Sequence, residues 1–210
     1  LNFYNEDIHL FFYFLFLLGI FFIFFNFDNN FTTLFLSLTS SVSNIGFSLN
    51  NNSSNLAFIL LILVIIGGSF FSTSSGIRFL KIYSLFKYSI NEILSYSRPK
   101  NVYVNKHLFS KDFFKLDEIY KYFLSIIIFV ISLIILNTLL TLSGVNFEDS
   151  FKLSVLTLMN TVNSSMYGLE DFNFRDLHFF TKYYLILFMI IGRVELLTLL
   201  IICKKYLFKN

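Results

Sequence analysis

Apolar residues in this chain gather in long unbroken runs, not in the alternating pattern of a half-buried strand. Residues 8–25 form an uncharged run that is long enough for a membrane-spanning helix of roughly 20 residues. Residues 123–142 form a second full span, and residues 179–207 predict a long final helix. These runs predict an all-α membrane protein with several spanning helices.

Shorter segments follow the first two spans. Residues 31–41 predict a helix that is too short to cross a bilayer, that Asp28, Asn29 and Asn30 can cap, and that leads into a polar loop. Residues 146–167 show the same combination of short helix and loop. A short helix followed by a polar loop at membrane depth is typical of a re-entrant segment.

The order of span, short helix, loop and span therefore occurs twice. Residues 27–31 (FDNNF) match residues 147–151 (FEDSF) at an offset of 120, and Leu38 recurs as Leu158 in the same register. We interpret this match as an internal repeat.

The second half of the first unit contains a break. Residues 56–66 are apolar but too few to span a bilayer, and a Gly- and Ser-rich stretch at residues 67–76 interrupts them before an increasingly basic segment resumes at Ile77. We expect one helix that is broken at membrane depth, because such breaks mark ion or substrate pathways. Two helices joined by an aqueous loop are the alternative.

Composition and charge agree with a membrane location. The 210 residues are 56% hydrophobic and 14% charged, against about 25% charged in ordinary globular domains. The lone Cys203 excludes a disulfide scaffold, and the modest net charge of +3 disfavours a nucleic-acid partner. The chain starts at Leu1 without a positively charged leader, so we expect no signal peptide but an incomplete or internally started product.

Charge also predicts the topology. The segment 78–121 holds nine of the sixteen Lys and Arg residues against four acids, which predicts that this part is cytoplasmic. The later segment 148–182 leans acidic, as expected of the outer side. The chain therefore divides into residues 1–95, a basic cytoplasmic linker at residues 96–116, and residues 117–210.

Enzyme chemistry has no candidate in the sequence. The three histidines share no metal-ligand spacing, and there is no nucleophile elbow or Walker loop, so we expect neither an enzyme nor a bound cofactor. The polar loop at residues 43–48 has the means to line a cation path, because Gly46 lets carbonyl oxygens turn inward and the dipole of the preceding helix favours a cation.

Arg193 is the other candidate functional residue. It lies near the middle of the predicted final helix, where a charge costs a few kcal/mol, so it is expected to face a polar pathway. Glu195 is two positions on and points to a different side of the helix. A structural ion pair between helices is the alternative.

Three motifs together resemble the Trk/Ktr/HKT superfamily of potassium transporters. Residues 66–78 (IGGSFFSTSSGIR) are similar to the family pattern IGGSSGSTAGGIK, and residues 43–47 (SNIGF) are similar to a filter of the T-x-G-F type. Residues 192–198 (GRVELLT) are similar to GRLEIFT. The family fold has four repeats of helix, pore helix, filter and helix around one pore, and the resemblance makes residues 1–95 the third repeat and residues 117–210 the fourth.

The resemblance implies roles for individual residues. K⁺ would bind the carbonyl groups of two filter segments, with Asn163 at the place of a filter glycine and Ser164 at the place of the following proline. Arg193 would be the pore arginine below them. The two filter segments are Ser43, Asn44, Ile45, Gly46 and Phe47, and Asn160, Thr161, Val162, Asn163 and Ser164. The gating loop is formed by Gly67, Gly68, Ser69, Ser72, Thr73, Ser74, Ser75 and Gly76, with Phe70 and Phe71 in place of small residues.

The resemblance further implies K⁺ uptake by a multi-pass protein of the bacterial cytoplasmic (inner) membrane. Its partners would be membrane lipid, two N-terminal repeats missing from this chain, a second copy in a homodimer and a nucleotide-binding regulatory subunit of the TrkA/KtrA kind. A Na⁺-permeable member of the superfamily is one alternative. Another is a non-channel subunit of an energy-transducing complex, in which Arg193 and Glu195 serve proton transfer or assembly. The repeated short helix and loop favour the channel.

Overall fold

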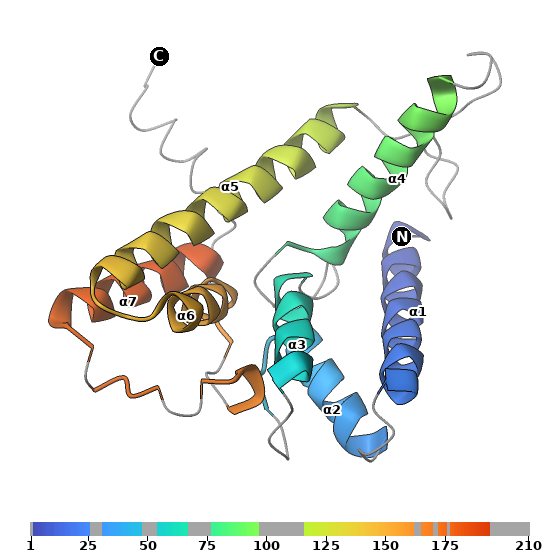
Figure 1. Cartoon of the computed structure of the whole chain (residues 1–210). Coiled ribbons are helices and arrows are strands. Elements are labelled where there is room, and N and C mark those ends of the chain that lie inside the picture. Colours follow the sequence, from blue (N-terminus) through green and yellow to red (C-terminus); the bar gives the residue numbers. More distant parts are fainter. Residues whose placement is uncertain are drawn as a thin grey trace, which may run out of the picture.

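The computed structural model describes residues 2–25, 31–47, 54–66, 77–96, 116–161, 165–169, 172–175 and 177–193. This part of the chain is helical and contains no strand (Figure 1). Its elements are α1 (Asn2–Phe25), α2 (Phe31–Val42), α3 (Ser54–Ile66), α4 (Phe79–Tyr96), α5 (Leu116–Leu142), α6 (Phe147–Met159), the 3₁₀ turn η1 (Ser165–Tyr167) and α7 (Phe179–Arg193). The all-α fold class is thereby confirmed.

The helices form two groups that meet along α3 and α6. Figure 1 shows α1, α2 and α3 on one side and α5, α6 and α7 on the other, and contacts between α3 and α6 and between α3 and η1 join the groups. The C-terminal end of α4 and the N-terminal end of α5 lie at the same end of the molecule. The 97–115 part of the predicted linker lies outside the described residues.

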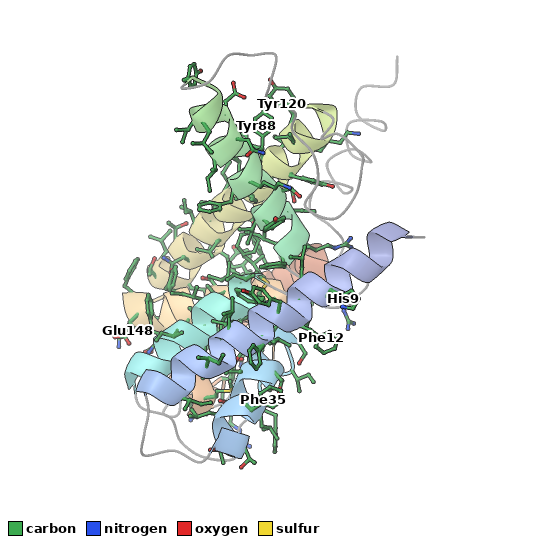
Figure 2. The ribbon with its side chains drawn as sticks, turned by 90° about the vertical axis from the view of Figure 1, so that its right-hand side faces the viewer. His9, Phe12, Phe35, Tyr88, Tyr120 and Glu148 are labelled. Atoms are coloured by element: carbon green, nitrogen blue, oxygen red, sulfur yellow. The ribbon has the colours of Figure 1, made fainter. Side chains whose placement is uncertain are left out.

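Helices α4 and α5 pack antiparallel. Lys81 Nζ on α4 donates to Ser125 Oγ on α5 at 3.2 Å. Further along α4, Tyr88 lies near Tyr120, which is earlier in α5 (Figure 2). Phe79, at the start of α4, packs on Phe14 of α1 with 4.8 Å between ring centroids. These contacts tie α4 to both helix groups.

Helix α6 forms the centre of the core. All of its residues from Leu153 to Met159 are buried, although Ser154 and Thr157 are polar. Their hydroxyl groups donate to the carbonyl oxygens of Phe151 and Leu153, so burial leaves no hydroxyl donor unsatisfied. Apolar side chains surround α6 and complete the core, among them Leu60 and Val64 of α3, Leu136 and Leu140 of α5, Met166 and Tyr167 of η1 and Leu185 of α7.

Helix α5 is the one described helix that is long and apolar enough to cross a membrane, over Ile119–Leu142. Only 28% of its most apolar window is buried. Exposed aliphatic side chains such as Ile127, Ile131 and Ile134 make up much of the rest. Water does not favour so much exposed apolar surface, whereas a lipid environment does.

The short helices lie where the sequence predicts them. Residues 31–41 correspond to α2, and the predicted segment at 146–167 contains α6 and η1. Around the predicted break, α3 ends at Ile66 and α4 begins at Phe79, while residues 67–76 lie outside the described residues. The predicted final helix is described as far as Arg193.

The described helices do not follow the offset of 120 at their C-terminal ends. Asn44 after α2 and Asn160 after α6 both have a positive φ, and they lie 116 positions apart. Residues 27–30 lie outside the described residues, so the match of residues 27–31 with residues 147–151 stays a prediction.

Candidate functional site

The first predicted filter segment begins where α2 ends. Asn44 has a left-handed backbone with φ +59°, and its N–H donates to the carbonyl oxygen of Ser41 at 3.1 Å. The N–H of Ile45 donates to the carbonyl oxygen of Ser40 at 2.9 Å. This pair of bonds is a Schellman motif, which ends a helix by turning the chain sharply.

Beyond this turn the backbone stays close to α2. Gly46 is buried and has φ +76°, a left-handed conformation that favours glycine. The N–H of Phe47 donates to Ser40 Oγ at 2.6 Å. The side chains of Ile45 and Phe47 are both more than half exposed. The segment is thus a tight loop that is held by its backbone and presents two apolar side chains outward.

The second predicted filter segment begins with the same motif. Asn160 has φ +54°, and its N–H donates to the carbonyl oxygen of Thr157 at 3.2 Å. The N–H of Thr161 donates to the carbonyl oxygen of Leu156 at 3.0 Å. Asn160 therefore corresponds to Asn44. Val162, Asn163 and Ser164 lie outside the described residues.

Asn160 also joins two helices. Its Nδ2 donates to the carbonyl oxygen of Met189 on α7 at 2.9 Å. Thr161 is only 7% exposed, and its Oγ1 has no hydrogen-bond partner among the described residues. Both residues line a cavity of about 310 Å³ between α6 and α7. A buried hydroxyl oxygen next to a helix C-terminus is a hard oxygen ligand of the kind that a cation or a water molecule uses.

Hydroxyl groups are concentrated in α2. Ser37, Thr39 and Ser41 donate to carbonyl oxygens of their own helix at 2.8–3.0 Å, and Ser43 does so just after it. Each hydroxyl oxygen keeps its lone pairs for another donor or a cation. Thr39, Ser40 and Ser43 line an open pocket of about 490 Å³ together with Ile45, Phe47 and three apolar residues of α1 and α2, Phe11, Leu15 and Leu36.

A side-chain hydrogen bond links η1 to α2. Tyr167 of η1 is fully buried, and its hydroxyl donates to Ser41 Oγ in the last turn of α2 at 3.4 Å. Ser41 Oγ also donates to the carbonyl oxygen of Ser37. The segment that follows the second filter is therefore fixed to the helix that precedes the first one. Sequence reasoning assigns no role to Tyr167, because neither its residue type nor its position signals a partner 126 residues away.

The arginine motif has a packing role at Gly192. A Cβ at Gly192 would overlap the carbonyl oxygen of Leu158 and lie 2.9 Å from its carbonyl carbon. Helix α7 therefore crosses α6 in direct backbone contact, just before the Asn160 turn. Arg193 follows at the end of the described part of α7 and is exposed. Glu195 and all the predicted gating residues from Gly67 to Gly76 lie outside the described residues, so they are not placed relative to Arg193.

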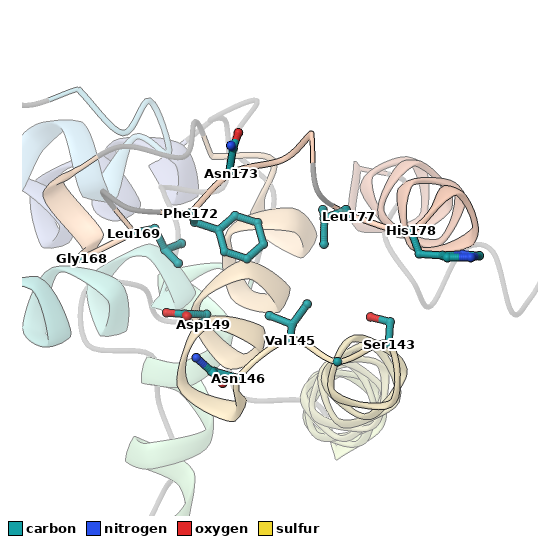
Figure 3. A pocket seen from close by; sticks show the side chains of 11 residues that line it. Ser143, Val145, Asn146, Asp149, Gly168, Leu169, Phe172, Asn173, Leu177 and His178 are labelled. Atoms are coloured by element: carbon teal, nitrogen blue, oxygen red, sulfur yellow. The ribbon is translucent and has the colours of Figure 1, made fainter.

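A polar pocket that the sequence analysis did not single out lies between the α5–α6 turn and the start of α7 (Figure 3). It has a volume of about 690 Å³, and its lining includes Asp149, His178, Asn146 and Asn173. The acidic lean of residues 148–182 is the sequence signal that points toward it. No cluster of three metal-ligating side chains occurs among the described residues.

An ion pair marks the start of α6. Lys152 Nζ lies 2.6 Å from Glu148 Oε1, one turn earlier, and also donates to the carbonyl oxygen of Gly168 at 3.3 Å. The hydrogen bond from Lys152 lowers the pKa of the Glu148 carboxyl below its ordinary value.

No protein-family model and no curated protein matches the chain.

Proposed function

We propose that this chain is a pore-forming part of a monovalent-cation uptake protein, with K⁺ as the favoured ion. The observation that carries the proposal is the pair of short helices α2 and α6, each ending in an Asn with positive φ and the same two backbone hydrogen bonds. In a bilayer, two such helix ends direct partial negative charge and carbonyl oxygens toward a shared cation path. The chain would then hold two of the repeats around the pore.

Membrane insertion is supported by the exposed apolar surface of α5. We infer a multi-pass protein of a bacterial cytoplasmic membrane, with the linker at residues 96–116 inside. Asp149, in the pocket of Figure 3, would lie at the outer mouth, where a carboxylate raises the local concentration of cations. Further repeats, a second copy and a cytoplasmic nucleotide-binding subunit remain the expected partners.

Ion flux tests the function. In a protein in which two further repeats precede this chain, K⁺ or Rb⁺ uptake into cells that lack their own K⁺ uptake should depend on Gly46. If the protein instead gave no cation uptake and was needed for proton pumping by a membrane complex, the result would support the alternative of a non-channel subunit of an energy-transducing complex.

Labelling tests the topology separately. After Cys203→Ser, a cysteine placed at Asn101 should react with an impermeant reagent from the inside, and one placed at Asn173 from the outside. Reaction of both from the same side would contradict the proposed arrangement.

A further inference from the structure

An apolar groove of about 450 Å³ runs between α3 and α6, where the two helix groups meet. Its volume is within the range of about 300–1,000 Å³ that small-ligand sites occupy. Leu61 and Tyr167 form its buried base, and the rings of Phe58 and Phe147 stand at its edges, 59% and 69% exposed. The groove is therefore open to whatever surrounds the chain.

One end of the groove is charged. Glu148 and Lys152 line it and form the ion pair described above, with Glu148 at the periphery of the molecule (Figure 2). The ammonium group of Lys152 has three N–H donors, of which Glu148 and Gly168 take two. One donor is left for an outside acceptor. The carboxylate of Glu148 is largely exposed and can accept further hydrogen bonds.

This combination has a specific chemical complement. An acyl chain matches the apolar length of the groove, a phosphate matches the remaining Lys152 donor, and an amine matches Glu148. We propose that the groove binds one zwitterionic phospholipid, with its acyl chain against Phe58 and Leu61, its phosphate at Lys152 and its ammonium group at Glu148. This inference rests on the proposed function only in that it requires the chain to be in a bilayer.

Other occupants fit less well. Phosphatidylglycerol has no amine for Glu148, and the negative charge of its phosphate has no headgroup cation to balance it near that carboxylate. An apolar helix of a partner would cover Phe58 and Phe147 but would also remove water from the ion pair without replacing its hydrogen bonds, which is costly. A zwitterionic headgroup avoids both costs.

The absence of tryptophan from the sequence permits a direct test. In the Phe58→Trp protein, reconstituted in vesicles, brominated phosphatidylethanolamine should quench the fluorescence more than the same fraction of brominated phosphatidylglycerol does. Phe16→Trp is the control, because Phe16 is 65% exposed on α1 and does not line the groove. It should be quenched equally by both lipids.

Charge variants then identify the contacts. In the Phe58→Trp protein, the additional change Lys152→Met should lower the affinity for phosphatidylethanolamine relative to phosphatidylglycerol about two- to fivefold, as expected for the loss of a solvent-exposed charge contact. Glu148→Gln should remove the preference over phosphatidylglycerol. Lys182→Met is the matched control, since Lys182 Nζ bonds to the carbonyl oxygen of Arg175 elsewhere, and it should change neither value.

Two results would overturn the proposal. One is equal quenching by both lipids in the Phe58→Trp protein, and the other is loss of quenching at that position alone, which would indicate a protein partner in the groove. Absence of quenching in the Phe16→Trp protein as well would instead contradict membrane insertion, and with it the proposed function. Helix content of each variant, measured by circular dichroism, separates these results from misfolding.

Discussion

The hydroxyl of Tyr167 donates to Ser41 Oγ at 3.4 Å, although 126 residues separate the two in sequence. Ser41 is in the last turn of α2, and Tyr167 closes η1 after the second predicted filter segment. The bond therefore joins the helix before the first proposed filter segment to the turn after the second one. Because both residues are fully buried, water does not replace the bond when either partner is removed.

Removal of this hydroxyl should destabilise the fold moderately. We expect Tyr167→Phe to lower the free energy of unfolding by about 0.5–1.5 kcal/mol, since the ring still fills its place and one hydrogen bond is lost. Ser41→Ala should act similarly, and the double variant should lose less than the sum of the two. Denaturant unfolding in detergent measures this, with Tyr183→Phe, at an exposed tyrosine, as the neutral control. Strict additivity would argue against the bond.

Gly46 should accept no side chain without a change in ion preference. Its φ of +76° costs a residue with a Cβ about 1–2 kcal/mol, and relief of this strain would turn the carbonyl groups of the loop. We expect Gly46→Ala to alter the ratio of K⁺ to Na⁺ uptake in the four-repeat protein. Gly144→Ala carries the same strain at φ +93° in an open turn, so it should change stability but not the ion ratio. An unchanged ratio in both variants would remove the loop from the filter.

Gly192 should be required for the packing of α7 on α6. The Cβ of Gly192→Ala meets the backbone of Leu158, which cannot rotate away, so we expect a loss of about 1–3 kcal/mol or more. Gly19→Ala is the control, because a Cβ at this helical glycine meets nothing within 4 Å. It should be neutral or stabilising by about 1 kcal/mol through helix propensity. Thermal unfolding midpoints of the two variants measure this difference. Equal midpoints would mean that Gly192 does not contact the Leu158 backbone.

The ion pair at the start of α6 should give the stability a pH dependence. Lys152 lowers the pKa of Glu148 in the folded state, so the folded state binds this proton less readily than the unfolded chain does. The stabilising effect is therefore present above the ordinary value of 4.5 and is lost as the pH falls through the lowered folded value. We expect the difference in unfolding midpoint between the parent and Glu148→Gln to shrink from pH 7 to pH 3. A difference that does not change with pH would mean that the pair does not contribute.

Arg193 should slow ion passage if it faces the path. A positive charge on its guanidinium near the path would raise the barrier for K⁺. We expect Arg193→Ala to raise uptake per molecule of protein in the membrane. A normalised rate at or below that of the parent would leave Arg193 a structural or surface residue.

The positions of the helices could be predicted from the sequence because each depends on a local property. Apolar runs indicated the positions of α1, α3, α5 and α7. The left-handed turns at Asn44 and Asn160 relate the two helix ends at a spacing of 116 residues, whereas a five-letter match carries little information in a chain with 31 Phe residues. Such turns are visible only from the backbone.

The site was predictable to a lesser degree. The residue type of Gly46 permits its positive φ, but Gly19 and Gly192 lie in helices, so the sequence alone does not specify this conformation. The contacts of Tyr167 and Asn160 depend on which helices become neighbours, and no local pattern specifies that. The sequence interpretation of the Arg193 motif rests on the charge of Arg193. In the structure the neighbouring Gly192 has the better-defined role, because only a glycine lets α7 contact the backbone of Leu158.

The hydroxyl bonds within α2 bear on the order in which the protein assembles. Ser37, Thr39 and Ser41 donate to carbonyl oxygens of α2 itself. The helix therefore needs neither water nor a second helix to satisfy these donors, which lowers the cost of moving it into hydrocarbon. In the membrane location that we propose, α1 and α2 would enter the bilayer together during synthesis, before the later helices are made. Ser41 then keeps a lone pair ready for Tyr167, which the ribosome adds 126 residues later.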